Sequence, residues 1–150
     1  MIDKNSFKLS VIMPCYNEAR TIEKVLDRIN ESLVFYQINN YEIVIVDDHS
    51  TDGTKEKLQK YTSNNKIKIF YHEMNMGKGS AIHTAIERVT GDLIIIQDAD
   101  LEYDPMDYNK LLLPFFETDA EVVYGSRFMG GGKYVRIHFF WHFLANKILT

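Results

Sequence analysis

The sequence predicts an α/β domain built on an open, mainly parallel, twisted sheet with helices on both faces. Short apolar, β-branched segments alternate along the chain with segments of helical periodicity. Strands that alternate with helices form right-handed βαβ units, and these units build a largely parallel sheet. The composition, 45% hydrophobic and 25% charged, is that of a globular protein, and 150 residues suffice for one domain with a core.

The first half of the chain contains two strands and two helices in alternation. Residues 8–13 (KLSVIM) form a short apolar run, which predicts a strand. Residues 21–33 carry apolar side chains at helical spacing, and residues 42–46 (EIVIV) form a second buried strand. Residues 50–54 form a turn rich in helix-capping side chains, so we expect a short helix that ends near Tyr61.

The second half of the chain repeats the pattern. Residues 66–71 read as a third strand, and residues 78–90 as a helix with one apolar face that stops at Gly91. Leu93–Ile96 is a continuous aliphatic run, which is expected of a central parallel strand covered on both faces. Two elements complete the prediction: a helix opened by the N-cap Asp104 and by Pro105, and a fifth strand at residues 121–124.

The C-terminal part differs from the rest in charge. Residues 1–121 hold 13 basic and 21 acidic side chains, a net of −8, whereas residues 122–150 hold four basic and no acidic ones. Residues 134–150 are apolar and aromatic and contain no helix stop. We therefore expect a domain over residues 1–133, followed by the truncated start of an amphipathic helix that meets a membrane surface or a phosphate-bearing partner. The alternatives are a chance cluster of four charges and a core helix without its packing partner.

Targeting and redox signals are few. The single cysteine, Cys15, excludes an intrachain disulfide framework, so a reducing compartment is expected. The N-terminus lacks the apolar segment of a signal peptide, and no stretch approaches the roughly 20 apolar residues of a membrane span. These observations predict a cytoplasmic protein. Nucleic acid is not expected as a partner, and the oligomeric state stays open.

Polar residues follow the carboxyl ends of the predicted strands. In an open parallel sheet these ends meet at one edge, where ligands bind, so the polar residues predict a binding site. A structural protein has little reason to gather carboxylates at this edge. The predicted site residues are Pro14, Tyr16, Asn17, Glu18, Asp47, Asp48, Lys78, Asp98, Asp100, Glu102 and Arg127.

Asp98 and Asp100 are the most specific indication of a binding site in this set. Two carboxylates one residue apart, just past a strand, can turn the same way and offer oxygens to a hard cation such as Mg²⁺ or Mn²⁺. Glu102 is a further ligand or a support for the other two. The alternative is a turn-capping role, because such triplets are common in turns.

Four further residues have both a functional and a structural interpretation. Asp48 can accept hydrogen bonds from a base or a ribose hydroxyl, and Asp47 is expected to share this role with helix capping. Lys78, flanked by glycines, fits neither the Walker loop nor the dinucleotide fingerprint, but a lysine that opens a helix can contact an anion. Arg127 can clamp a diphosphate. A helix cap, a plain helix start and a surface charge are the alternatives.

Five segments, in the same order along the chain, resemble the family 2 glycosyltransferases of the GT-A fold. The resemblance is closest to the branch that transfers mannose or glucose to dolichyl or polyprenyl phosphate. It covers nearly the whole chain, although members of the family continue well past residue 150. The segments are SVIMPCYNE (10–18), IVDDHSTDGT (45–54), NMGKGSA (75–81), GDLIIIQDADLEY (91–103) and YGSRF (124–128).

The resemblance implies a Rossmann-like nucleotide-binding domain and an inverting reaction. The donor would be a nucleotide diphosphate sugar of the GDP-mannose or UDP-glucose type, and the acceptor a polyprenyl or dolichyl phosphate at the cytoplasmic face of the membrane. The alternatives are transfer to a saccharide in cell-surface polysaccharide synthesis, and a nucleotide-sugar-binding fragment without turnover.

The resemblance also implies roles for single residues. A divalent metal, Mg²⁺ or Mn²⁺, would be bound by Asp100 and Glu102, with Asp98 near the ribose or the metal. Arg127 would face the diphosphate or the acceptor phosphate, and together with Asp98 and Asp100 it would stabilise the developing charge. The residues that would line the nucleotide pocket are Pro14, Tyr16, Glu18 and Asp48.

Overall fold

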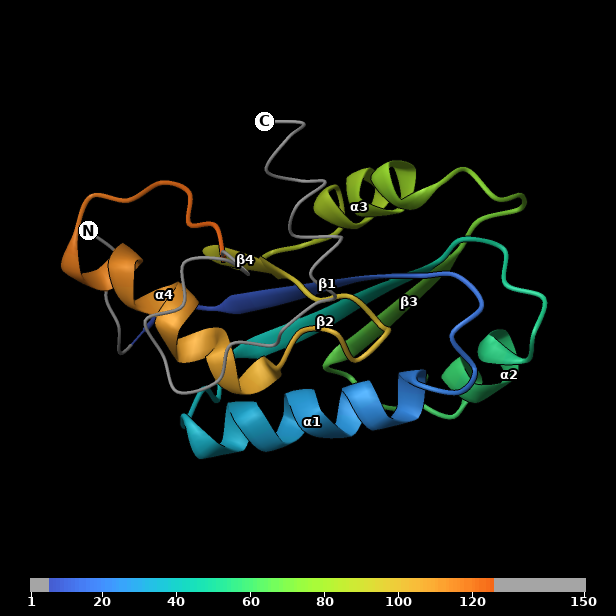
Figure 1. Cartoon of the computed structure of the whole chain (residues 1–150), viewed down its shortest axis with the longest axis horizontal. Coiled ribbons are helices and arrows are strands. Elements are labelled where there is room, and N and C mark those ends of the chain that lie inside the picture. The colour runs from blue at the N-terminus through green and yellow to red at the C-terminus, as the bar shows by residue number, and fades with distance from the viewer. Residues whose placement is uncertain (1–5, 126–150) are drawn as a thin grey trace, which may run out of the picture.

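The structure is a computed structural model that describes residues 6–125; residues 1–5 and 126–150 lie outside the described part. It contains a four-stranded sheet in which all neighbouring strands are parallel and the order is β3-β2-β1-β4 (Figure 1). The predicted parallel sheet is therefore confirmed. The strands are β1 (Leu9–Cys15), β2 (Tyr41–Asp47), β3 (Ile67–Tyr71) and β4 (Leu93–Ile96).

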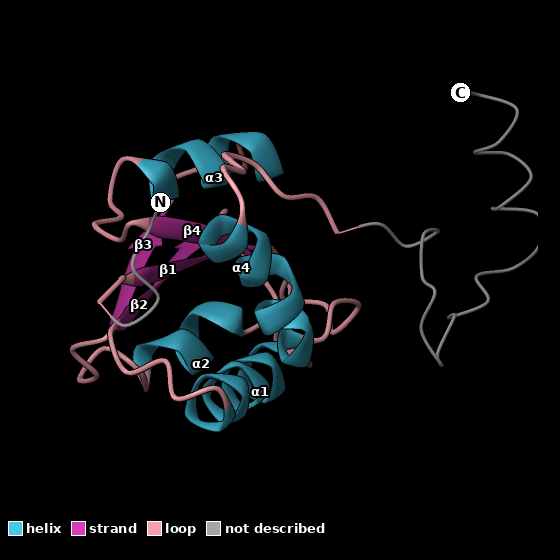
Figure 2. Cartoon of the chain, turned by 90° about the vertical axis from the view of Figure 1, so that its left-hand side faces the viewer, coloured by secondary structure: helices cyan, strands magenta, loops and turns pink. Residues whose placement is uncertain are grey.

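Helices lie on both faces of the sheet, as predicted (Figure 2). One face carries α3, which packs mainly on β1 and β2, and the opposite face carries α1 and α2. Tyr108 and Leu112 of α4 join the same core as α1. The helices are α1 (Ile22–Phe35), α2 (Thr54–Gln59), α3 (Lys78–Ile86), the 3₁₀ turn η1 (Pro105–Asp107) and α4 (Tyr108–Glu117).

The strand β1 is the centre of the core, because all seven of its residues are buried. Successive side chains of a strand point to opposite faces. Met13 therefore belongs to the core shared with α1, whereas Ile12 belongs to the core shared with α3. The helix α3 contributes two fully buried alanines one turn apart, Ala81 and Ala85. This packed centre holds the strand ends from which the site loops depart.

The strand β4 lies at an edge of the described sheet, so the prediction of a central strand covered on both faces was wrong for this part of the chain. Leu93 and Ile95 enter the core, but Ile94 and Ile96 are 42% and 49% exposed. The physical reason is the position of α3, which packs mainly on β1 and β2. A continuous aliphatic run therefore does not determine how many faces of a strand are covered.

The predicted fifth strand was also wrong. Residues 121–125 form no strand, and Val122 and Tyr124 are mostly exposed. A strand needs a neighbour to satisfy its backbone donors and acceptors. Within residues 6–125, none of the four strands of the sheet pairs with this segment.

The fourth helical segment starts as predicted, but the third helix ends early. Asp104 accepts a hydrogen bond from the N–H of Met106 at 3.1 Å, and Pro105 opens η1, which continues into α4. In contrast, α3 stops at Ile86 instead of Thr90. Thr90 does not continue the helix, because its N–H and its hydroxyl both donate hydrogen bonds to the Glu42 carboxylate.

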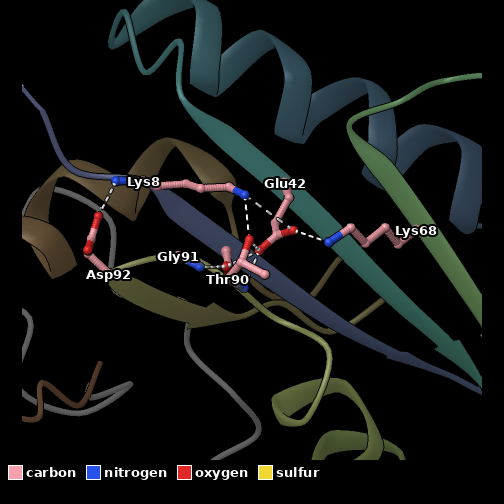
Figure 3. A network of polar contacts seen from close by, with 7 residues as sticks. Lys8, Glu42, Lys68, Thr90, Gly91 and Asp92 are labelled. Carbon is pink, nitrogen blue, oxygen red and sulfur yellow. Dashed lines mark hydrogen bonds and ion pairs between the residues drawn. The ribbon is translucent and has the colours of Figure 1, made fainter.

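Glu42 is a buried carboxylate at the amino-terminal edge of the sheet (Figure 3). It accepts hydrogen bonds from the Ser10 hydroxyl at 2.8 Å, the Thr90 N–H at 2.5 Å and the Lys68 ammonium at 2.7 Å, and the Lys8 ammonium lies at 3.5 Å. Burial by itself raises the pKa of Glu42, but the hydrogen bonds from Lys68, Thr90 and Ser10 outweigh it and lower the pKa to about 2. The side chain is therefore ionised, and its hydrogen bonds join β2 to β1, to β3 and to the segment that precedes β4.

No helix within residues 6–125 has the length and apolarity needed to cross a membrane. The segment 134–150, the domain boundary at residue 133 and Arg127 lie outside the described residues.

Candidate functional site

A pocket of about 370 Å³ lies at the carboxyl edge of the sheet. The loops that follow β1 and β4, the end of β2 and the start of α3 all contribute to its wall. The edge that was predicted from the strand ends therefore does contain a hollow. The predicted site residues that line it are Pro14, Tyr16, Glu18, Asp48, Lys78, Asp98 and Asp100.

Two predicted residues, Asn17 and Asp47, hold the wall of the pocket and do not line it. The Asn17 side-chain oxygen accepts from the N–H of Thr51 at 2.8 Å, and the Asn17 N–H donates to the Ser50 hydroxyl at 2.8 Å. Asp47 accepts from both the hydroxyl and the N–H of Ser50. The loop after β1 is thereby fastened to the loop after β2. Asp47 acts here as a turn cap.

Glu18 connects the pocket to two helices. Its carboxylate accepts from the Thr21 hydroxyl at 2.5 Å, and its carbonyl oxygen accepts from the N–H of Ile22, where α1 begins. Its own N–H donates to the hydroxyl of Thr54, the first residue of α2. The preceding Tyr16 is 48% exposed, so its ring is available at the mouth of the pocket.

Three of the four non-glycine residues with a left-handed backbone within residues 6–125 lie in the loops around the pocket, and the fourth, Gln37, follows α1. Asn17, His49 and Leu101 follow β1, β2 and β4, and their φ angles are 56°, 65° and 67°. Residues other than glycine rarely adopt this left-handed region, and they persist there only where surrounding contacts hold them. The hydrogen bonds of Asn17 described above are contacts of this kind. Such strained positions gather at sites where function constrains the backbone.

Asp48 is buried, and its carboxylate is occupied by a network. One oxygen accepts from the N–H of Met76 at 2.9 Å and lies 2.7 Å from Nδ1 of His72, and the other accepts from the N–H of Gly77 at 2.7 Å. Burial by itself raises the pKa of Asp48, but the hydrogen bonds from Met76, His72 and Gly77 lower it below its usual value. On the far side, Nε2 of His72 lies 3.0 Å from the Thr84 hydroxyl of α3. Asp48 therefore shapes the loop that leads into α3.

Lys78 and Asp98 pair across the pocket. The Lys78 ammonium lies 2.7 Å from each oxygen of the Asp98 carboxylate. The Asp98 side chain is 18% exposed and that of Lys78 59%. Asp100 lines the same pocket, and its carboxylate accepts the N–H of Glu102 at 2.9 Å. Glu102 itself does not line the pocket.

A buried glutamine supports the loop that carries these aspartates. The Gln97 side chain donates to the carbonyl oxygens of Asp98 and Tyr103, and it accepts from the Tyr108 hydroxyl at 3.0 Å. Gln97 is almost fully buried, directly after β4. Both ends of the Asp98–Tyr103 turn are thus attached to one side chain. This leaves the two carboxylates in a fixed loop at the pocket.

The chemistry of Asp98 and Asp100 suits a divalent cation. Carboxylate oxygens are the ligands that Mg²⁺ and Mn²⁺ prefer, and these cations usually keep water and substrate phosphate oxygens as further ligands. Within residues 6–125, no group of three or more His, Cys, Asp and Glu side chains forms a complete metal site. Two carboxylates fit such a cation when water and phosphate oxygens are its further ligands.

Cys15 also lines the pocket, as a buried thiol whose surroundings disfavour the thiolate. Burial raises the pKa of its thiol, and the neighbouring carboxylates of Asp47, Glu18 and Asp52 raise it further. The thiol therefore stays protonated, whereas the thiolate is the reactive form.

Sequence reasoning missed His72, Thr84 and Gln97 as parts of the site. His72 has no metal-ligand spacing to another histidine of the chain, so its spacing gives no sign of a site. Its position directly after β3, at the same edge as the other polar residues, was the signal that could have identified it. Gln97 likewise follows a strand directly.

The chain matches the family "Glycosyl transferase family 2" over residues 10–149. Among curated proteins, it is 37% identical over 126 residues to the dolichol-phosphate mannosyltransferase of Pyrococcus furiosus, covering 84% of this chain and 35% of that protein. It is 28% identical to the dodecaprenyl-phosphate galacturonate synthase of Rhizobium johnstonii, covering 81% of this chain and 36% of that protein. The chain thus spans about a third of the length of these relatives.

Solved structures show the same fold. The mannosyltransferase PcManGT from Pyrobaculum calidifontis, in complex with GDP-Man and Mn²⁺, has a TM-score of 0.59 and 34% identity and covers 67% of this chain and 30% of that one. TarS 1–349 of S. aureus, in complex with UDP, has a TM-score of 0.62 and 25% identity and covers 82% of this chain and 40% of that one.

Proposed function

This chain belongs to glycosyl transferase family 2, and from that premise we propose that it is the nucleotide-sugar-binding part of an inverting glycosyltransferase. The enzyme of which it is a part transfers a hexose from a donor of the GDP-mannose or UDP-glucose type to a polyprenyl or dolichyl phosphate. One observation carries the proposal: seven predicted site residues, from four separate segments, line a single pocket at the carboxyl edge of the sheet. The names of the two curated relatives support a polyprenyl-type phosphate as the acceptor.

The pocket residues divide between the parts of the donor. Tyr16, with its exposed ring, and Pro14, Glu18 and Asp48 surround the nucleoside. Lys78 is the first residue of α3, where the helix dipole and the ammonium both favour the diphosphate. Arg127, beyond the described residues, contributes a second cation for the diphosphate or for the acceptor phosphate.

Asp98 and Asp100 bind a divalent cation, Mg²⁺ or Mn²⁺, and Glu102 either joins them or supports Asp100. When bound, such a cation neutralises the negative charge that builds on the departing nucleotide diphosphate. The solved complex of PcManGT with GDP-Man and Mn²⁺ supports this requirement. Gln97 keeps the loop of the two aspartates in place, so that little reorganisation is needed when the donor arrives.

The reaction is a displacement at the anomeric carbon. An oxygen of the acceptor phosphate forms the new bond, while the bond to the diphosphate breaks and its electron pair leaves with the nucleotide, which inverts the configuration. A phosphate acceptor is already anionic, so this chemistry does not need a general base among the pocket residues. A saccharide hydroxyl would need one.

We place the reaction at the cytoplasmic face of the membrane, where a lipid phosphate is accessible. Residues 1–133 form the donor-binding domain, and the basic, aromatic segment 134–150 is the acceptor side. Both assignments follow from the sequence and from the acceptors of the relatives.

The test is donor binding and transfer by the full 150-residue chain. Calorimetric titration with GDP-mannose and UDP-glucose, each with Mn²⁺ and with EDTA, should show binding of at least one donor that depends on the cation. Mass spectrometry after incubation with a polyprenyl phosphate should show the glycosylated lipid only at a low level, because the chain spans about a third of the length of its relatives, whereas a saccharide acceptor should stay unmodified. Donor binding that is equal in EDTA and Mn²⁺, or no binding of either donor, would refute the proposal.

A further inference from the structure

Lys78 and Asp98 form an ion pair, although the proposed function assigns Lys78 to a diphosphate and Asp98 to a divalent cation. The Lys78 ammonium lies 2.7 Å from both oxygens of Asp98. Under the proposed function, Asp98 faces a divalent cation, and Lys78 faces a diphosphate. An ammonium and a divalent cation at the same carboxylate repel each other. A divalent cation at Asp98 therefore weakens the pair, because the ammonium lies close to both carboxylate oxygens.

The surroundings allow the lysine side chain to leave while its backbone stays in place. The N–H of the preceding Gly77 is bound to Asp48, which is itself bound to His72. The Lys78 side chain is 59% exposed, so solvent surrounds much of it. A lysine has a long flexible stem with a single charge at its end, which suits a change of partner better than the planar, forked guanidinium of arginine.

We infer that Lys78 is an exchangeable counter-ion. Without donor it neutralises Asp98, and it moves to the diphosphate when a divalent cation takes Asp98. This inference rests on the proposed function for the identity of the anion. Because the same carboxylate serves both cations, divalent metal alone binds weakly, and the diphosphate and the metal each favour the binding of the other.

The test is the substitution Lys78→Met in the full chain, with two affinities measured separately. The affinity for Mn²⁺ without nucleotide is read from the free-Mn²⁺ signal in electron paramagnetic resonance. Removal of the competing ammonium should raise it about two- to fivefold, the range expected for loss of one partly exposed ion pair. The affinity for GDP or UDP in the presence of Mn²⁺ should fall about ten- to a hundredfold, because a charge-assisted contact is lost.

Lys110→Met is the matched control. Lys110 is also ion-paired, to Asp107 at 2.6 Å, but it is exposed and does not line the pocket. The Lys110→Met substitution changes the net charge by the same amount as Lys78→Met, so any general electrostatic effect on the Mn²⁺ affinity appears in both variants. Lys110→Met should leave the affinity for GDP and UDP unchanged.

Two further variants distinguish the counter-ion from a structural role. Lys78→Arg keeps the charge and should not bind Mn²⁺ more tightly than the unmodified chain. In an Asp98→Asn background, Lys78→Met should no longer raise the Mn²⁺ affinity. The inference is overturned if Lys78→Met binds Mn²⁺ no more tightly than Lys110→Met does, or if Mn²⁺ and nucleotide affinities fall together. If no variant binds a nucleotide, the proposed function fails, and the Mn²⁺ titration still decides whether Lys78 competes for Asp98.

Discussion

At Gly91, one added methyl group should cost stability without touching the pocket. A Cβ at this residue would lie 2.5 Å from the Ser10 hydroxyl oxygen, 2.7 Å from the carbonyl oxygen of Lys8 and 2.9 Å from the backbone nitrogen of Ser10. Two of these atoms are backbone at the start of the central strand, so they cannot rotate away. The Gly91 N–H also donates to the Ser10 hydroxyl at 3.0 Å, and that hydroxyl in turn donates to Glu42.

The expected cost follows from these contacts. Overpacking of a well-packed site costs about 1–3 kcal/mol. A weakened hydrogen bond adds about 1 kcal/mol. Gly91→Ala should therefore lower the free energy of unfolding by about 2–4 kcal/mol, a large part of the roughly 5–15 kcal/mol that stabilises a domain.

Urea denaturation followed by circular dichroism measures this change, with Gly79→Ala as the control. Gly79 lies in α3 with no atom within 4 Å of the position of a Cβ, so alanine there should stabilise the helix by about 0.5–1 kcal/mol. The two glycine substitutions should thus shift the midpoint in opposite directions. A Gly91→Ala midpoint equal to that of the unmodified chain would refute the argument from close approach.

Three other predictions concern the buried carboxylates and the pocket. Because the pKa of Glu42 is lowered to about 2, its stabilising effect is complete above about pH 5 and is lost as the pH falls toward about 2. Urea midpoints should therefore fall over this interval, and Glu42→Gln should make the fall smaller. Part of the fall should remain in this variant, because the pKa values of Asp48 and Asp52 are also lowered. Asp100→Asn should weaken nucleotide-sugar binding in the presence of Mn²⁺ by about ten- to a hundredfold, as measured by calorimetry. A thermal melt should show an unchanged melting temperature. Unchanged affinity would mean that Asp100 only caps its turn. Thr84→Val removes the hydroxyl that contacts His72 and should weaken nucleotide binding severalfold. His83→Ala, at the neighbouring but exposed position of α3, should bind nucleotide like the unmodified chain. Equal nucleotide affinities of the two variants would mean that His72 does not influence nucleotide binding in the pocket.

The sequence predicted the main strands and helices because their signals are local. Apolar residues at helical spacing identified α1, and the caps Asp104 and Pro105 identified the start of η1. The early end of α3 was not predictable in this way, since it depends on a bond between Thr90 and Glu42, 48 residues apart. The coverage of β4 likewise depends on where α3 packs, and no local pattern encodes that position.

The same distinction applies to the site. Polar residues at strand ends predicted which edge carries the pocket, because the topology of a parallel sheet brings these ends together. The partners of single side chains were not predictable. Asp48 was expected to reach a nucleotide, and its contacts with His72 and Gly77 come from two other segments. Asn17 was expected in the pocket, and its hydrogen bonds turn it toward the loop after β2.

The Glu42 cluster and the pocket lie at opposite ends of the same strands. In β2, Glu42 is the second residue, whereas Asp48 directly follows the last one. Substitutions in the loops beyond the carboxyl ends therefore leave the contacts of the amino ends intact. Over generations, the loops of such a domain can change in sequence while the hydrogen bonds that join the amino ends of the strands remain. A sheet anchored at one end in this way tolerates sequence variation in the loops at its other end.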